Sequence, residues 1–273
     1  MVDYYLFNRV YRLLTKNEDN MSIKHLLNIE PFSWPENVEE QLCELLSDPK
    51  ADHSERKIAA ELAGEIAVIN EELVAALMKI IQNSDESDEI RSESTISLGP
   101  VLEFTNEQEC EAFDQFDGLQ EFFDSFDNDI ISKDTFDNIK QQLHELYFDE
   151  TLSDNLRRSL LETSIHAPMN WHVKEVAKAF ASEDKKWKLT AIIAMQWIAG
   201  FDKEILQTLN NSDPEIHFIA LLAVSNWRLA DGWDHVANLL ADDKTPKNLL
   251  LASMEAAVNI NPEKAEVLIQ PYI

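Results

Sequence analysis

The sequence of 273 residues contains few of the residues that build β-rich or disulfide-bonded proteins. It has only 5 glycines, and glycine is the residue that most readily adopts the positive φ angles of tight turns, so β-sandwiches and barrels are not expected. The 2 cysteines, Cys43 and Cys110, lie far apart and form no CxxC pair. A disulfide framework or a structural zinc site is therefore not expected, and a reducing compartment fits the sequence.

Long hydrophobic segments are also missing. No stretch approaches the roughly 18 consecutive apolar residues of a membrane span. Residues 1–20 lack the uninterrupted apolar core of a signal peptide. We therefore expect a cytoplasmic protein without a membrane partner. Hydrophobic residues nevertheless make up 45% of the chain, which is enough for a sizeable core.

Positive charge is scarce. The chain has 51 acidic and 23 basic residues, which gives a formal net charge of −28. Such a surface repels nucleic-acid phosphates and anionic lipids, and the longest basic run is only Lys185–Lys186. We therefore expect no nucleic-acid partner, and we expect a protein partner that carries a basic patch.

Motifs typical of enzymes are absent as well. The sequence has no GxGxxG, GxxxxGK[ST], GxSxG or HExxH pattern, and its 7 histidines are scattered. Carboxylate pairs are too abundant in such an acidic chain to indicate a catalytic site. The sequence therefore predicts a non-enzymatic protein without cofactor or metal.

An internal repeat is the main feature that the sequence does contain. An amphipathic segment ends in an acidic turn, and a second segment rich in small and apolar residues follows. Equivalent anchor positions are separated by steps of 35, 66, 31, 29 and 32 residues: Arg56, Arg91, Arg157, Lys188, His217 and Leu249. The step of 66 residues corresponds to two repeat units or to one unit that carries an insertion.

The second segment of each unit reads as a buried helix. Residues 210–227 start polar, turn at Asp213–Pro214 and then run apolar on nearly every side, which is expected for a helix surrounded by its partner and by neighbouring units. Small residues three and six positions after the anchor allow close approach. Helix N-caps are predicted at Asp52, Ser87, Ser153 and Asp213, with Pro214 and Pro246 in first turns.

These patterns resemble the HEAT repeats of bacterial proteins, in particular the phycobilisome-lyase-like type. The resemblance rests on Arg56 to Gly64, on Arg91 to Gly99, and on the text of residues 97–102, 157–172 and 187–209. It implies an all-α fold, a right-handed α-α superhelix of about six to seven helical pairs in a single domain. The implied parts are an N-terminal cap (1–37), repeats (38–103 and 136–260), an insertion (104–135) and a C-terminal cap (261–273).

The expected insertion is acidic and rich in phenylalanine. Its phenylalanines recur at helical spacing at Phe113, Phe116, Phe123 and Phe126, and aspartates accompany them at Asp114, Asp117, Asp124 and Asp127. One interpretation is an extra helix whose phenylalanine face packs on the repeats. The other is an acidic lip, formed by the four aspartates, that docks a basic partner.

Candidate binding residues gather in the C-terminal half, where five of the six tryptophans lie. Large aromatic side chains can seal the joints between units or form a ridge on a binding surface. His217, at the repeat's basic position, is expected to bond a neighbouring acidic turn. The candidate patch, on the concave side or an edge of the solenoid, comprises His166, Asn170, Trp171, Trp187, His217, Asn226, Trp227 and Trp233.

The leading functional hypothesis is a non-enzymatic protein-interaction scaffold or adaptor that uses the concave surface of the solenoid. The resemblance also implies an alternative, a lyase-like protein that handles a ligand or chromophore in an apolar pocket. Some HEAT-like folds act as DNA glycosylases, but the net charge of −28 disfavours that activity here.

Overall fold

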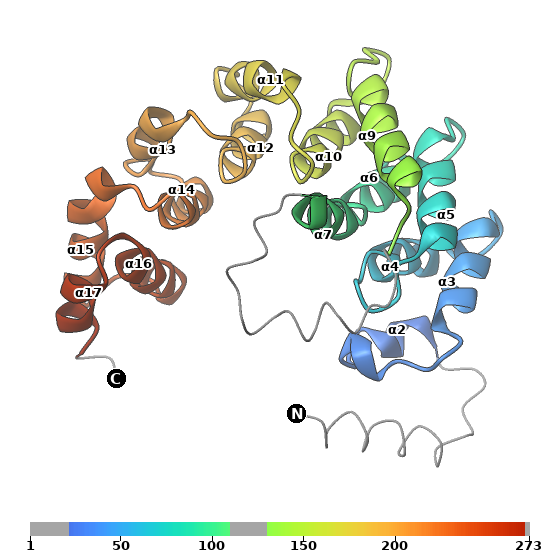
Figure 1. The fold of residues 1–273 in the computed structure, drawn as a ribbon, viewed down its shortest axis with the longest axis horizontal. Helices are drawn as coiled ribbons and strands as arrows, with labels where there is room; N and C mark the ends of the chain where they lie inside the picture. The colour runs from blue at the N-terminus through green and yellow to red at the C-terminus, as the bar shows by residue number, and fades with distance from the viewer. Residues whose placement is uncertain (1–21, 110–129, 271–273) are drawn as a thin grey trace. The chain divides into compact units, whose positions relative to one another are not determined.

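The computed structural model describes residues 22–109 and 130–270, and every secondary-structure element within them is a helix. The predicted all-α class is thus confirmed. The chain divides into two compact units, Met1–Ala167 (unit 1) and Pro168–Ile273 (unit 2). Each unit is described by itself below (Figure 1). None of the described helices is long and apolar enough to cross a membrane.

Unit 1 consists of helix pairs arranged in two layers. The first layer contains α3, α5 and α9, and the second contains α4, α6 and α10 (Figure 1). Each first-layer helix packs on the second-layer helix that follows it, and second-layer helices also pack on one another. The elements are α2 (Ile23–Leu26), η1 (Pro31–Ser33), α3 (Val38–Ser47), α4 (His53–Ala63), α5 (Glu71–Gln82), α6 (Asp88–Ile96), α7 (Gly99–Glu109), α9 (Lys133–Tyr147) and α10 (Asp154–Ser164).

Unit 2 has the same construction. Its first layer contains α11, α13 and α15, and its second layer contains α12, α14 and α16. Helix α14 packs on both α12 and α16, and α17 packs on α15 and α16. The elements are α11 (Trp171–Phe180), α12 (Lys185–Ala194), α13 (Asp202–Thr208), α14 (Pro214–Asn226), η3 (Ala230–Gly232), α15 (Trp233–Ala241), α16 (Lys247–Ile260) and α17 (Pro262–Ile269). The apolar helix predicted after the turn at Asp213–Pro214 is α14, which packs on α12 and α16 in this layer.

The predicted helix starts are confirmed. Asp52, Ser87, Ser153 and Asp213 each accept hydrogen bonds from backbone N–H groups of the first turn that follows. Pro214 occupies the first turn of α14 as expected. Pro246, in contrast, is the residue before α16 rather than part of its first turn. The reason is that its ψ of 143° is extended, so the helix begins one residue later.

The long step in the repeat contains one unit with an insertion. Helix α10 packs directly on α6, although α7 and residues 110–129 separate them in the sequence. Glu71 on α5 accepts hydrogen bonds from the Ser132 backbone N–H (2.6 Å) and the Thr135 hydroxyl (2.6 Å), which attach α9 beside α5. The pair α9–α10 therefore follows the pair α5–α6 without an intervening pair.

Both predicted ends of the insertion fall inside helices. Helix α7 starts at Gly99 and α9 at Lys133, so residues 104–135 include the end of one helix and the start of another. Phe104 and Phe136 are both buried. Both phenylalanines lie in the helices on either side of residues 110–129, so they do not decide between the two interpretations of the insertion. The predicted acidic lip (Asp114, Asp117, Asp124 and Asp127) and the phenylalanines from 113 to 126 lie outside the described residues.

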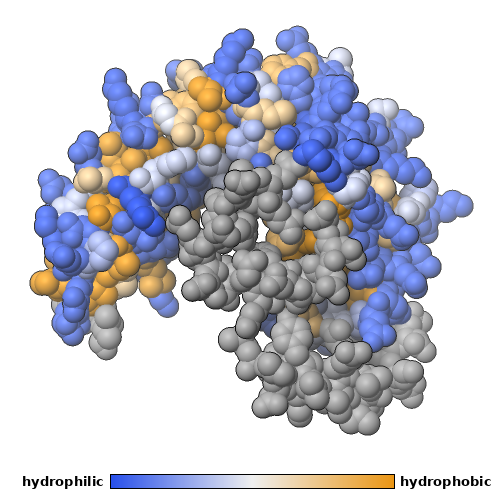
Figure 2. Space-filling view, in the orientation of Figure 1, coloured by the Kyte–Doolittle hydropathy of each residue, from blue (hydrophilic) through white to orange (hydrophobic). Residues whose placement is uncertain are grey.

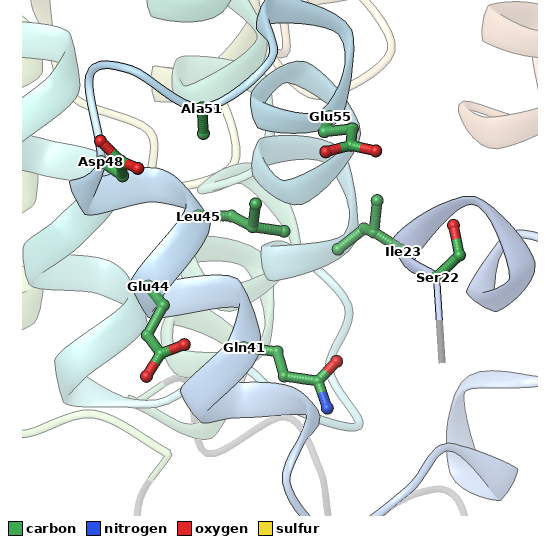
Figure 3. A pocket seen from close by; sticks show the side chains of 8 residues that line it. All are labelled: Ser22, Ile23, Gln41, Glu44, Leu45, Asp48, Ala51 and Glu55. Atoms are coloured by element: carbon green, nitrogen blue, oxygen red, sulfur yellow. The ribbon is translucent and has the colours of Figure 1, made fainter. Parts of the chain in front are cut away.

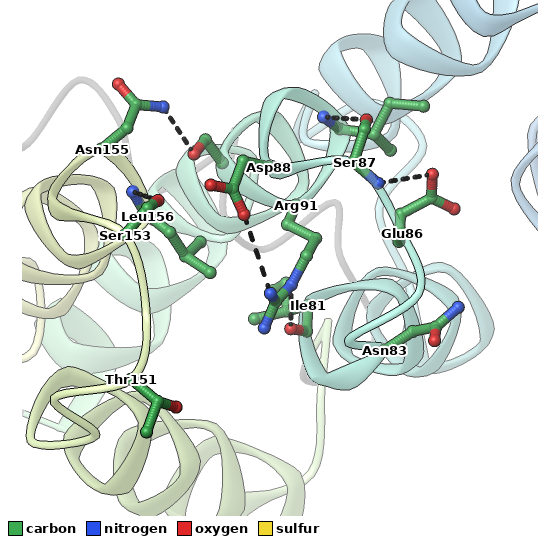
Figure 4. Close-up of polar contacts among 12 residues, drawn as sticks. Ile81, Asn83, Glu86, Ser87, Asp88, Arg91, Thr151, Ser153, Asn155 and Leu156 are labelled. Atoms are coloured by element: carbon green, nitrogen blue, oxygen red, sulfur yellow. Dashed lines mark hydrogen bonds and ion pairs between the residues drawn. The ribbon is translucent and has the colours of Figure 1, made fainter.

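Repeat arginines in unit 1 tie each second-layer helix to the end of its first-layer partner, and Figure 4 shows this contact for Arg91 and Ile81. Each arginine donates a hydrogen bond to the main-chain carbonyl ten residues earlier, in the last turn of the preceding helix. These otherwise unpaired carbonyls need a donor. The pairs are Arg56 with Leu46 (3.2 Å), Arg91 with Ile81 (2.9 Å) and Arg157 with Tyr147 (3.1 Å).

In the last repeat a different side chain donates to the equivalent carbonyl. The anchor position of this repeat holds Leu249, which has no donor, and the carbonyl ten residues earlier is that of Leu239. The hydroxyl of Thr245 donates to that carbonyl at 2.7 Å. A threonine in the turn therefore replaces the arginine, and this leaves the anchor position free for a buried leucine.

Small residues bring the second-layer helices close together, as predicted. A Cβ atom added to Gly64, at the end of α4, would lie 2.5 Å from the carbonyl oxygen of Ser97, at the end of α6. The Thr163 hydroxyl on α10 donates to the Thr95 carbonyl on α6 at 3.0 Å. The second layer of unit 1 is thus packed nearly backbone to backbone at these points.

Candidate functional site

The predicted patch is divided by the structure. His166 belongs to unit 1, and the other seven residues belong to unit 2. His166 follows α10, and its Nδ1 lies 3.2 Å from a carboxylate oxygen of Glu103 on α7. Its ring also lies against Gly99, where an added Cβ would come within 3.3 Å of Cδ2. His166 therefore joins α10 to α7 within its own unit.

Asn170 and Trp171 mark the start of α11. Asn170 is exposed and its side chain does not cap the helix. The half-buried ring of Trp171 stacks on the ring of His172, with centroids 3.8 Å apart and planes tilted by 32°. His172 is fully buried, and its Nδ1 accepts a hydrogen bond from the Met169 backbone N–H at 2.9 Å. This aromatic pair packs the helix start.

Trp187 and Trp233 are also half-buried at helix starts. Trp187 lies in the first turn of α12, and Trp233 is the first residue of α15. The ammonium group of Lys264 on α17 lies 5.5 Å from the centroid of the Trp233 ring. Such a cation–π contact couples α17 to α15.

His217 has a different partner from the one expected. Its Nε2 lies 2.8 Å from Nε2 of His235 on α15, and the predicted bond to an acidic turn is not the contact observed. In unit 1 the arginines at this position reach back to the preceding helix, but the shorter imidazole meets α15 instead. His235 was not predicted, because no pattern in the sequence relates it to His217.

Asn226 and Trp227 lie at the opposite end of α14 from His217. The indole N–H of Trp227 donates to the Met195 carbonyl beyond the end of α12, at 2.7 Å. The Asn259 amide, in the last turn of α16, donates to the Ser225 hydroxyl on α14 at 2.8 Å. These two bonds align the C-terminal ends of three consecutive second-layer helices.

Polar and aromatic side chains gather along this row of helix ends. Asn226, Arg228 and Asn259 are exposed, Trp227 is half-buried, and Trp197 is 37% exposed. Arg228 adopts a φ of 50°, in the left-handed region that non-glycine residues seldom occupy. We call this set the second-layer edge: Gln196, Trp197, Asn226, Trp227, Arg228, Val258 and Asn259.

The sequence carried a signal for this edge that the prediction used only in part. Trp197, Asn226 and Val258 each stand nine residues after the anchors Lys188, His217 and Leu249. Comparing that offset across units would have added Trp197 and the residues beside it to Asn226 and Trp227. Figure 2 shows hydrophobic side chains among hydrophilic ones on the visible face of unit 2 over α13 to α17.

A separate hollow of about 510 Å³ lies in unit 1 between α2, α3 and α4 (Figure 3). Ile23 and Leu45 form its apolar part, and Glu44, Asp48 and Glu55 supply carboxylates. No lysine or arginine is among its lining residues, so the hollow is electrostatically attractive to cations.

Comparison with known proteins adds little to these contacts. No family model and no curated protein matches the chain. The crystal structure of the YibA protein of Escherichia coli, a structural genomics target, is 13% identical, covers 94% of this chain and 80% of its own, and gives a TM-score of 0.49. An engineered protein from the same programme is 17% identical, covers 83% of this chain and 97% of its own, and gives a TM-score of 0.45. We therefore base the function on the residues of this chain.

Proposed function

We propose that the protein is a HEAT-type helical-repeat scaffold, not an enzyme, and that it binds a protein partner along the second-layer edge of unit 2. The observation that carries the proposal is the alignment of amide and tryptophan side chains at the ends of α12, α14 and α16, of which Trp197, Asn226 and Asn259 are exposed. Tryptophan and arginine are the residues most enriched in the energetic centres of protein interfaces.

The chemistry of the edge suits an extended peptide. An amide side chain both donates and accepts hydrogen bonds, so Gln196, Asn226 and Asn259 are able to pair with main-chain N–H and C=O groups. Packed helices are spaced by about 8–10 Å. An extended chain rises about 3.3 Å per residue, so one amide on each helix would meet about every third residue of the peptide.

Charge supports the choice of partner. The chain carries a net charge of −28, and a field of this sign speeds association with basic proteins and slows association with acidic ones. Arg228 is the one charged side chain of the second-layer edge. Binding is therefore expected to weaken as salt rises, through the long-range field rather than through contacts at the edge.

Site-specific photo-cross-linking tests the proposal. A photoreactive phenylalanine analogue placed at Asn226 or Asn259 should give discrete protein adducts in cells. The matched controls are exposed positions on first-layer helices of the same unit, Lys178 on α11 and Asn238 on α15. Adducts from the edge alone would support the proposal. Equal adducts from all four positions, or none from the edge, would refute it.

A further inference from the structure

The contact between His217 and His235 is a single hydrogen bond between two imidazole rings. Their Nε2 atoms are 2.8 Å apart, and the ring centroids are 5.0 Å apart with planes at 74°. The distance between the ring centroids exceeds the distance between the two Nε2 atoms by nearly twice the distance from an imidazole centroid to its own ring atoms. The two nitrogens therefore face each other along the line between the rings, as in a linear N–H···N bond.

This geometry limits how many protons the pair can hold. A hydrogen bond requires that one Nε2 carries a proton and that the other presents a lone pair. A pair with no net charge or with one positive charge meets this condition. A pair with two positive charges does not, because two N–H groups would then oppose each other at 2.8 Å.

We propose that His217 and His235 form a proton-sharing latch that holds α14 against α15 and opens when both imidazoles are protonated, so that this joint of unit 2 responds to pH.

The surroundings do not stabilise the doubly charged state. Burial lowers the pKa of both imidazoles, and the positive charge of His235 lowers that of His217 further. Among the described residues, no ion pair joins either ring to a charged residue on the elements around the pair; these residues are Lys185, Lys186, Lys188, Asp202, Lys203, Glu204, Asp213, Glu215, Arg228, Asp231, Asp234, Lys247, Glu255, Glu263, Lys264 and Glu266.

The direction of the pH response follows. When folding lowers the pKa of a histidine, the folded state binds fewer protons than the unfolded state. The latch therefore makes its full contribution to folding stability above the ordinary histidine pKa of about 6.5, and this contribution is lost as pH falls below that value. In unit 1 the same repeat position carries arginines, which stay charged at every relevant pH, so those joints have no such response.

Nitrogen NMR of histidine-labelled full-length protein provides the first test. Above pH 7 the latch requires one imidazole of the pair to be protonated at Nε2 and the other at Nδ1. On acidification the second proton should bind to the pair well below the ordinary imidazole pKa of about 6.5. Two imidazoles with the same tautomer, each titrating near that ordinary value, would overturn the proposal.

Amide hydrogen exchange provides the second test, with rates corrected for their intrinsic dependence on pH. Exchange in α14 and α15 should rise by up to tenfold per pH unit below the pKa values of the pair, while α5 and α6 stay unchanged. His217→Gln and His235→Gln, which hydrogen-bond without titrating, should abolish this rise, and the control His53→Gln should keep it. A rise that persists in both glutamine variants, or no rise in the native protein, would refute the latch.

Discussion

Replacement of Arg91 by methionine tests whether the repeat arginines hold the two layers of unit 1 together. Arg91 is 5% exposed, and its Nε donates to the Ile81 carbonyl at 2.9 Å. Methionine keeps much of the side-chain length but has no donor. The variant Arg91→Met therefore leaves a buried carbonyl in the last turn of α5 without a partner.

The expected loss is worked out from these contacts. A buried acceptor left without a partner costs about 1–3 kcal/mol. The ion pair with Asp88 adds about 0–1 kcal/mol, because its atoms are 3.8 Å apart and Asp88 is exposed. Removal of a buried charge offsets part of this sum. We expect the free energy of unfolding to fall by about 2 kcal/mol.

Urea unfolding measures this change in the free energy of unfolding, and hydrogen exchange in peptides from α5 and α6 locates it in unit 1. Arg158→Met on α10 is the matched control, because it removes the same charge and, within residues 22–109 and 130–270, Arg158 bonds only the exposed Asn155. The control should change stability by less than about 0.5 kcal/mol. If Arg91→Met destabilised unit 1 no more than the control does, the hydrogen bond from Arg91 to the Ile81 carbonyl would contribute nothing to stability.

Three further predictions concern other contacts. Gly64→Ala should destabilise unit 1 by about 1–3 kcal/mol in urea unfolding, because its Cβ would lie 2.5 Å from the Ser97 carbonyl oxygen. Burial alone would raise the pKa of Glu86, but hydrogen bonds from Arg56 and the Ser87 N–H outweigh burial and lower the pKa. The variant Glu86→Gln should therefore lose the most stability above the ordinary glutamate pKa of about 4.3, and the loss should shrink as pH falls below that value. Arg228→Gly should raise the melting temperature by relieving a φ of 50°, a gain of about 0.5–1 kcal/mol.

Local structure could be predicted from the sequence because its signals are local. The caps at Asp52, Ser87, Ser153 and Asp213 follow from side chains that bond the next turn. The burial of α14 follows from its composition alone, since a helix without a polar face needs neighbours on most sides.

Features that depend on tertiary placement could not be predicted. The predicted boundary at residue 104 falls inside α7, because Val101, Leu102 and Phe104 continue the apolar pattern into that helix, and all three are buried. The hydrogen bond of His217 with His235 depends on how α15 returns along α14, which no local pattern encodes.

The candidate site was predicted only in part for a related reason. Trp227 both seals a joint, through its bond to Met195, and belongs to the second-layer edge. From the sequence, sealing a joint between units and lining a binding surface were alternative roles for the tryptophans, and composition alone could not decide between the two roles. The positive φ of Arg228 had no signal either, because glycine or asparagine is the usual residue there.

The measurement that tests the central claim most directly is the affinity of the cross-linked partner, once purified, for edge variants of the full chain. The variant Asn226→Ala should bind at least about tenfold more weakly, which corresponds to about 1.4 kcal/mol, with unchanged unfolding. The control Asn238→Ala, at an exposed position outside the edge, should bind like the native protein. Equal affinity of all three proteins would contradict the assignment of the second-layer edge as the binding surface.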